Sequence, residues 1–132
     1  MAGITPDEGE VELLKRGVNK STPDDLILKL YTNNKTPDES DEVADYTECT
    51  ADGYSAKTLT GANWTVQTTL GVSEASYAQQ TFSLTESATV YGYFIVNTAG
   101  TILIFAEKFS DGPYNIPSGG GDIKVTPKIR LD

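Results

Sequence analysis

Apolar side chains recur at every second position in several parts of this sequence, which is the spacing of a β-strand with one buried face. The clearest case is residues 26–32, where Leu26, Leu28 and Leu30 share one side. Clusters of Gly, Pro, Asn and Asp separate the apolar stretches and predict turns. Further strands are expected at residues 54–59, 64–69, 77–84, 90–96, 101–108 and 123–129.

The expected strands are short, and no stretch of the chain has a convincing helical period. Short strands joined by turns are typical of an all-β domain. We therefore expect residues 25–132 to form a two-sheet antiparallel β-sandwich, jelly-roll or immunoglobulin-like in topology. A chain of 132 residues is long enough to bury such a core without metals or disulfides.

Residues 1–24 have a different character, because they are mostly polar. Four residues interrupt any long regular element there: Pro6, Gly9, Gly17 and Pro23. We expect this segment to be an extended N-terminal arm. Its only strongly apolar cluster is Val11, Leu13 and Leu14, where the local pattern permits either a short strand or a helical turn. That cluster is a candidate partner-binding patch.

A second candidate lies in the stretch at residues 90–96. Strand alternation places Tyr91 and Tyr93 on one face and Phe94 on the other, so both faces are apolar or aromatic. Such a strand is either central in a sheet or meets a partner on one side. Core packing is the favoured interpretation, and Tyr91 and Tyr93 are the residues that a partner would contact.

The formal net charge of −9 limits the partners that this chain could have. An acidic protein repels phosphate backbones and anionic lipids, so we expect neither nucleic-acid nor membrane binding. The longest apolar run, residues 102–106, is far shorter than the roughly 20 residues of a membrane-spanning helix. The acidic first residues do not resemble a signal peptide, and a single cysteine gives no disulfide framework. We expect a soluble protein made in a cytoplasm.

Residues that could support catalysis or metal binding are scarce. The absence of histidine excludes the Ser-His-Asp triad, the Cys-His pair and most catalytic zinc sites. Cys49 is interpreted as a small buried hydrophobic residue. The acidic stretch 38–45 lacks the spacing of a calcium-binding EF-hand and is interpreted as an exposed loop. Residues 118–122 are rich in glycine, but no Gly-Lys-Ser/Thr follows, so they predict a turn.

These observations favour a protein that is not an enzyme and that has no cofactor. The enzyme alternative is a glycan hydrolase that uses two carboxylates from distant strands, because such a pair leaves no local motif. Nothing else in the sequence indicates it.

An ordered set of short motifs runs through the chain. Residues 28–34 read Leu-Lys-Leu-Tyr-Thr-Asn-Asn, and they are followed by Thr36-Pro37, Ala44-Asp45-Tyr46-Thr47-Glu48 and Gly53-Tyr54. Later motifs are Gln80-Thr81-Phe82, Tyr91-Gly92-Tyr93-Phe94, Ala106-Glu107-Lys108-Phe109 and Ile123-Lys124-Val125-Thr126-Pro127. In this order they resemble a pattern in small proteins of tailed-bacteriophage genomes. The resemblance spans residues 26–131.

The resemblance implies a structural protein of the virion, and we expect a capsid decoration (cement) protein that stabilises the assembled head. Its partners would be the major capsid protein and further copies of itself, as a dimer or trimer. The expected arm, residues 1–24, would order on a neighbouring subunit. The alternative is a tail, neck or fibre-associated binding module that contacts other virion proteins or a host receptor. No catalytic residues follow from the resemblance.

Overall fold

A computed structural model describes residues 3–131 of the chain. The protein is mostly β, which confirms the all-β prediction. The strands form several antiparallel sheets, none of which is closed. The described elements are α1 (Asp7–Gly17), β1 (Leu26–Tyr31), β2 (Lys57–Leu59), β3 (Thr65–Thr69), β4 (Val72–Ser76), β5 (Gln80–Leu84), β6 (Ala88–Val90), β7 (Gly92–Val96), β8 (Leu103–Lys108), β9 (Tyr114–Ile116), β10 (Gly121–Val125) and β11 (Lys128–Leu131), with 3-10 turns η1 (Val43–Asp45) and η2 (Gly61–Asn63).

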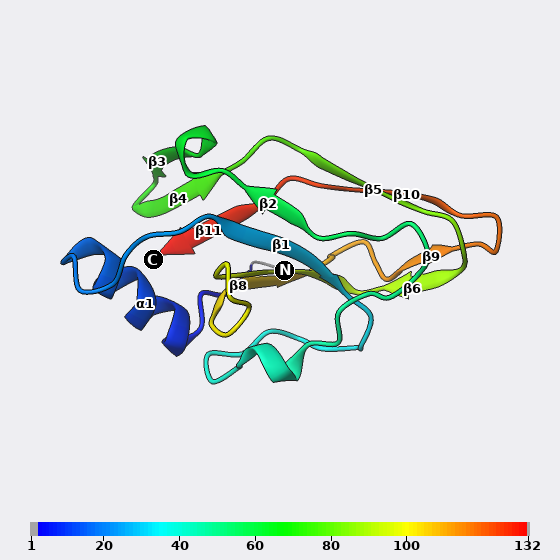
Figure 1. Ribbon diagram of the computed structural model, residues 1–132, viewed down its shortest axis with the longest axis horizontal. Helices are drawn as coiled ribbons and strands as arrows, with labels where there is room; N and C mark the ends of the chain where they lie inside the picture. The colour runs from blue at the N-terminus through cyan, green and yellow to red at the C-terminus, as the bar shows by residue number, and fades with distance from the viewer. Residues whose placement is uncertain (1–2, 132) are drawn as a thin grey trace.

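The second half of the chain is one long, interrupted β-hairpin. Its two legs pair in order as β4 with β11, β5 with β10, β6 with β9 and β7 with β8. The pairing runs from Ser73 opposite Leu131 at the open end to Val96 opposite Leu103 at the closed end. Pro127 separates β10 from β11 because a proline has no N–H for the ladder. Figure 1 shows the red and orange strands of the second leg lying alongside the green strands of the first.

The four-stranded sheet, in the order β2-β1-β7-β8, lies at the centre of the molecule. One face packs against β5, β10 and β11, where Leu28, Phe82 and Ile123 are buried in a common core. The opposite face is covered by the segment that includes η1, and there Tyr46 stacks on Phe94 with ring centroids 5.3 Å apart. Both faces of β7 are therefore buried, as its sequence of Gly and large apolar residues requires.

The expectation of an extended N-terminal arm is wrong for the residues that the structure describes. Ile4 pairs with Ala106 and extends the central sheet beyond β8, and α1 follows immediately. The absence of a side chain at Gly9 allows α1 to lie on β8, although a glycine at this position in the sequence predicts a break in a helix. A Cβ atom at this position would stand 2.7 Å from the carbonyl oxygens of both Leu103 and Ile104. Close backbone approach therefore outweighs the low helix propensity of glycine.

The charge pattern of α1 also favours a helix. Asp7, Glu8 and Glu10 lie in its first turn, and Lys15 and Arg16 lie in its last, which complements the helix dipole. Within residues 3–131, no helix has the length and apolar character of a membrane span.

Candidate binding surface

One side of α1 exposes apolar side chains at helical spacing. Val11, Leu14 and the C-cap residue Val18, directly after α1, are 51%, 69% and 74% exposed, and their positions follow the i, i+3, i+7 pattern of a single helix face. Leu13 is half-buried and packs against the core, and Gly9 and Glu12 are buried. The helix therefore gives the three predicted residues different environments: Val11 and Leu14 are exposed, and Leu13 is half-buried. Val18 was missed, because only a helical period links it to the others.

Hydrogen bonds hold α1 in place, so its exposed stripe (Val11, Leu14 and Val18) sits on a fixed element. The Leu103 amide donates to Glu8 Oε1 at 2.6 Å. The Glu12 carboxylate accepts from Arg16 Nε at 2.9 Å and from Ser21 Oγ at 3.1 Å. The hydrogen bond from Arg16 keeps the pKa of Glu12 below its usual range. Arg16 also pairs with Asp24 beyond the helix.

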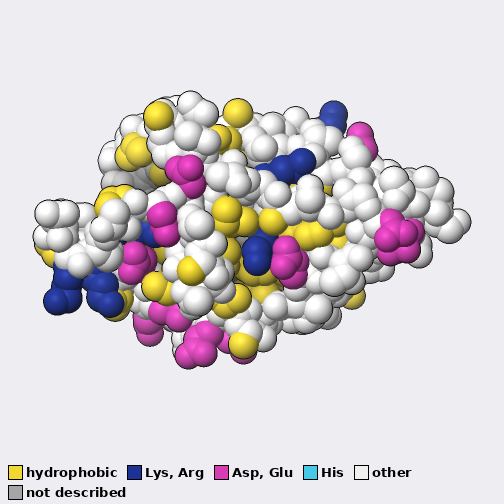
Figure 2. Space-filling view, in the orientation of Figure 1, with side chains coloured by type: hydrophobic (Ala, Val, Ile, Leu, Met, Phe, Trp, Pro, Cys, Tyr) yellow, Lys and Arg dark blue, Asp and Glu magenta, His cyan; other side chains and the backbone are white. Residues whose placement is uncertain are grey.

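The first turn of α1 has acidic surroundings, whereas its last turn carries Lys15 and Arg16. Figure 2 shows acidic side chains, in magenta, gathered along the lower left of the molecule beside the helix. The carboxylates of Asp7, Glu10 and Glu39 lie within 4.8 Å of one another. The pKa of Glu39 is raised, first by desolvation and then by repulsion from Glu10 and Asp7. Oxygen ligands at this spacing suit a hard cation or the basic side chain of a partner.

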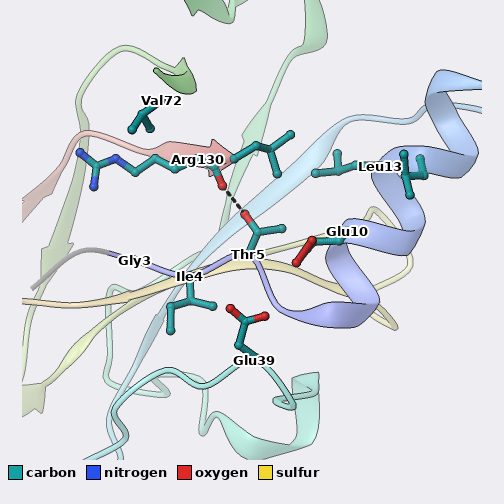
Figure 3. A pocket seen from close by; sticks show the side chains of 10 residues that line it. Gly3, Ile4, Thr5, Glu10, Leu13, Glu39, Val72 and Arg130 are labelled. Carbon is teal, nitrogen blue, oxygen red and sulfur yellow. Dashed lines mark hydrogen bonds between the residues drawn. The ribbon is translucent and has the colours of Figure 1, made fainter. Parts of the chain in front are cut away.

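A cleft of about 690 Å³ lies between α1 and the open end of the long hairpin. Figure 3 shows the segment around Thr5 running along its base, with Leu13 on one side and Val72 and Arg130 on the other. Thr5 Oγ1 donates to the Arg130 carbonyl at 2.7 Å and so ties the N-terminal segment to β11. The lining combines residues from the two ends of the chain with Glu39 and Val72 from its middle: Gly3, Ile4, Thr5, Glu10, Leu13, Leu14, Glu39, Val72, Arg130 and Leu131.

The acidic stretch 38–45 is exposed, as predicted, except for the buried Asp41 and the half-buried Val43. Asp41 is buried and pairs with Lys35 Nζ at 2.8 Å, and it accepts a hydrogen bond from the Tyr46 hydroxyl at 2.7 Å. Asp45 accepts from the Glu42 amide and caps η1. These carboxylates therefore stabilise the segment that covers Phe94. Glu39 is the member of this stretch that reaches the cleft.

The prediction that Tyr91 and Tyr93 share a face is wrong. Tyr93 is 3% exposed within the core, and its hydroxyl donates to Glu107 at 2.8 Å. Tyr91 is half-buried against the cluster on the opposite face of the sheet. The alternation shifts because the ladder is interrupted between β6 and β7, where the Tyr91 amide donates to the Tyr31 carbonyl. Tyr93 is therefore too buried to contact a partner.

Cys49 has the environment that the sequence predicted. It is 2% exposed, and burial raises the pKa of its thiol, so the reactive thiolate is disfavoured. The interpretation as a small buried hydrophobic residue is confirmed.

Comparisons of the chain with protein families, with curated proteins and with solved structures find no match. The candidate surface consists of the exposed stripe, the adjacent cleft and the carboxylate group of Asp7, Glu10 and Glu39, of which Glu10 and Glu39 line the cleft. An apolar helix face beside an acidic rim is suited to binding another macromolecule.

Proposed function

We propose that this protein is a decoration protein of tailed-bacteriophage heads and that it attaches to the assembled shell through α1. The observation that carries the proposal is the exposed stripe of Val11, Leu14 and Val18 on a helix that is fixed to the central sheet. A monomer that only needed solubility would place polar side chains there. The resemblance of the ordered motifs to small proteins of tailed-bacteriophage genomes is the reason for proposing a phage shell.

The mode of attachment that fits this stripe is a helix in an apolar groove. Such recognition uses anchors at i, i+3 and i+7 of one helix. The carboxylates of Asp7, Glu10 and Glu39 beside the stripe match a groove that is flanked by lysine or arginine side chains on the major capsid protein. Each contact is small, and many equivalent sites on a symmetric shell convert weak single contacts into stable coverage.

The fold that we propose for this role is a two-sheet, jelly-roll-like sandwich. A jelly roll has eight strands in two sheets, and the long hairpin here supplies four consecutive strand pairs. The shared core between the central sheet and β5, β10 and β11 supports two packed layers. A rigid sandwich of this kind would present α1 at one end.

The test uses substitutions on the exposed side of α1. A variant with Val11→Ser, Leu14→Ser and Val18→Ser removes the apolar anchors and leaves Gly9, Glu8 and Leu13 in their contacts. Deleting residues 1–24 is a poorer test, because it also removes the pairing of Ile4 with Ala106. The matched control replaces three exposed alanines elsewhere: Ala44→Ser, Ala56→Ser and Ala99→Ser.

The measurement is co-sedimentation of the purified protein with empty heads of the phage that encodes it. We expect the α1 variant to bind about 100-fold more weakly than the wild type, since loss of three apolar anchors costs roughly 3 kcal/mol or more. The alanine control should bind like the wild type. Unchanged binding of the α1 variant, or failure of the wild type to bind heads, overturns the proposal.

Copy number separates the head from the tail. Decoration of the shell requires many copies at symmetry-related positions, and a tail, neck or fibre module requires few copies at one vertex. Cryo-electron microscopy of intact particles resolves these two distributions. Density confined to a single vertex would contradict the decoration role and favour the alternative.

A further inference from the structure

Strand β3 is an unprotected sheet edge. It is the outer strand of the three-stranded sheet β11-β4-β3, and all five of its residues are exposed. On one side it pairs with β4, and on the other side no strand of residues 3–131 pairs with it. Figure 1 shows β3 at the upper left, away from the central sheet. Exposed edges of this kind offer unpaired N–H and C=O groups to another strand.

The sequence around β3 lacks the residues that usually protect an edge. Residues 58–73 contain no Asp, Glu, Lys, Arg or Pro, although charged residues make up 22% of the whole chain. Natural edge strands are commonly guarded by lysine, proline or a bulge. The net charge of −9 makes two copies repel each other over most of their surface, but this stretch adds no repulsion. The upper left of Figure 2, over β3 and β4, is mostly white and yellow.

The hairpin turn determines which backbone groups are free. Leu70 and Gly71 form a two-residue turn between Thr69 and Val72, and their φ angles of 51° and 82° are those of a type I′ turn. The residues that flank such a turn form a hydrogen-bonded pair, and this pairing recurs at every second residue. Thr69, Gln67 and Thr65 therefore bond to β4. The N–H and C=O groups of Val66 and Thr68 point to the free edge.

We propose that β3 pairs with β3 of a second copy of this chain, antiparallel about a two-fold axis at Gln67. In this register Val66 of each copy lies opposite Thr68 of the other. The outward groups of both residues then form the two hydrogen bonds of each pair, so every free donor and acceptor of the edge is satisfied. Thr65 lies opposite Thr69, and such β-branched pairs stabilise a sheet. A two-fold axis makes the contact closed, so it gives a dimer and not a fibre.

The same register accounts for Leu70. Its side chain is 99% exposed at a positive φ, an unusual conformation and position for a large apolar residue. Counting outward from Gln67, Leu70 of one copy falls beside Trp64 of the other. Trp64 is half-buried and packs edge-on against Tyr77 at 5.3 Å between ring centroids. The dimer thus places Leu70 against an aromatic ring that is already held in position.

The first test removes only the outward N–H of Thr68. Thr68→Pro deletes that donor and leaves the hydrogen bonds of Gln67 and Thr69 to β4 intact, and proline is tolerated on an edge strand. Thr68→Val is the matched control, because it keeps both the N–H and the β-branched shape. Should Thr68→Pro disturb the hairpin, Val66→Lys supplies a second variant. It brings two positive charges together across the axis, and Ala99→Lys adds the same charge at an exposed position outside β3 and its turn.

Sedimentation equilibrium between about 10 μM and 1 mM measures the association, and emission from Trp64, the one tryptophan of the chain, reports the same interface. We expect a weak dimer in the wild type, Thr68→Val and Ala99→Lys. Thr68→Pro and Val66→Lys should raise the dissociation constant at least tenfold and abolish the concentration-dependent shift of Trp64 emission. A wild type that stays monomeric, or a dimer that Val66→Lys leaves unchanged, overturns the inference. No capsid is used, so this result is independent of the proposed function.

Discussion

Strands β7 and β3 each have five residues, yet they occupy opposite environments. Every residue of β7 is buried, between β1 and β8 in the sheet and between packed side chains above and below. Every residue of β3 is exposed, and β4 is its one strand neighbour among residues 3–131. The side chains of β7 are Tyr, Phe, Ile and Val, whereas those of β3 are Thr, Val and Gln. Burial by neighbours, and not strand propensity, therefore separates a structural strand from one that is available to a partner.

The largest expected effect comes from truncating a buried side chain of β7. Phe94→Ala removes a ring that stacks on Tyr46 and leaves a cavity, so the free energy of unfolding should fall by about 3–5 kcal/mol. Val66→Ala in β3, at a side chain that is 74% exposed, should change it by less than about 0.5 kcal/mol. Urea unfolding followed by circular dichroism gives both values. Similar losses of unfolding free energy in the two variants would contradict the conclusion that burial distinguishes β7 from β3.

The strands that pack in the core could be predicted from the sequence, β1 and β5 by their alternation and β7 and β8 by their β-branched and aromatic residues. The expected strands at 26–32, 77–84, 90–96 and 101–108 contain β1, β5, β7 and β8. The shared face of Tyr91 and Tyr93 could not be predicted. A period of two assumes an unbroken strand, and the interruption between β6 and β7 depends on the distant partners Tyr31 and Phe109.

Helix α1 combines both environments, with an inner side like β7 and an outer side like β3. Gly9→Ala should destabilise the protein by about 2 kcal/mol, because its methyl group would meet the carbonyl oxygens of Leu103 and Ile104. Gly17→Ala, with no atom within 4 Å of its Cβ, should stabilise by roughly 0.5–1 kcal/mol through helix propensity. Thermal unfolding of the two variants measures the difference. Stabilisation by both would mean that α1 does not lie against β8 in solution.

Only part of the candidate surface could be predicted from the sequence, because the rest depends on contacts between distant segments. Val11 and Leu14 stand out as apolar residues in a polar segment, and they are exposed as a partner-binding patch requires. The cleft beside them unites residues 3–5 with Val72 and residues 130–131, which only the folded topology brings together. Val18 joins them only through the spacing of a continuous helix, and Gly9 and Gly17 in the sequence argue against such a helix.

A smaller loss than those of Phe94→Ala and Gly9→Ala is expected on the polar inner side of α1, and it depends on pH. The hydrogen bond from Arg16 lowers the pKa of Glu12 in the folded protein, so folding favours the ionised carboxylate. This stabilisation is complete above the unfolded pKa of about 4.3 and is lost as the pH falls through the lowered folded value. Glu12→Gln should therefore cost about 1.5 kcal/mol at pH 7 and almost nothing near pH 2.

Chemical unfolding of the wild type and Glu12→Gln across this pH range gives the difference, with Asp122→Asn on an exposed position of β10 as the control. A cost for Glu12→Gln that is the same at both pH values would show that the side chain acts through packing alone. In that case Glu12 would stabilise the protein as a packed side chain, like the residues of β7, and its charge would contribute nothing. A cost that disappears in acid would instead show that the ion pair between Glu12 and Arg16 stabilises the helix that carries the exposed stripe.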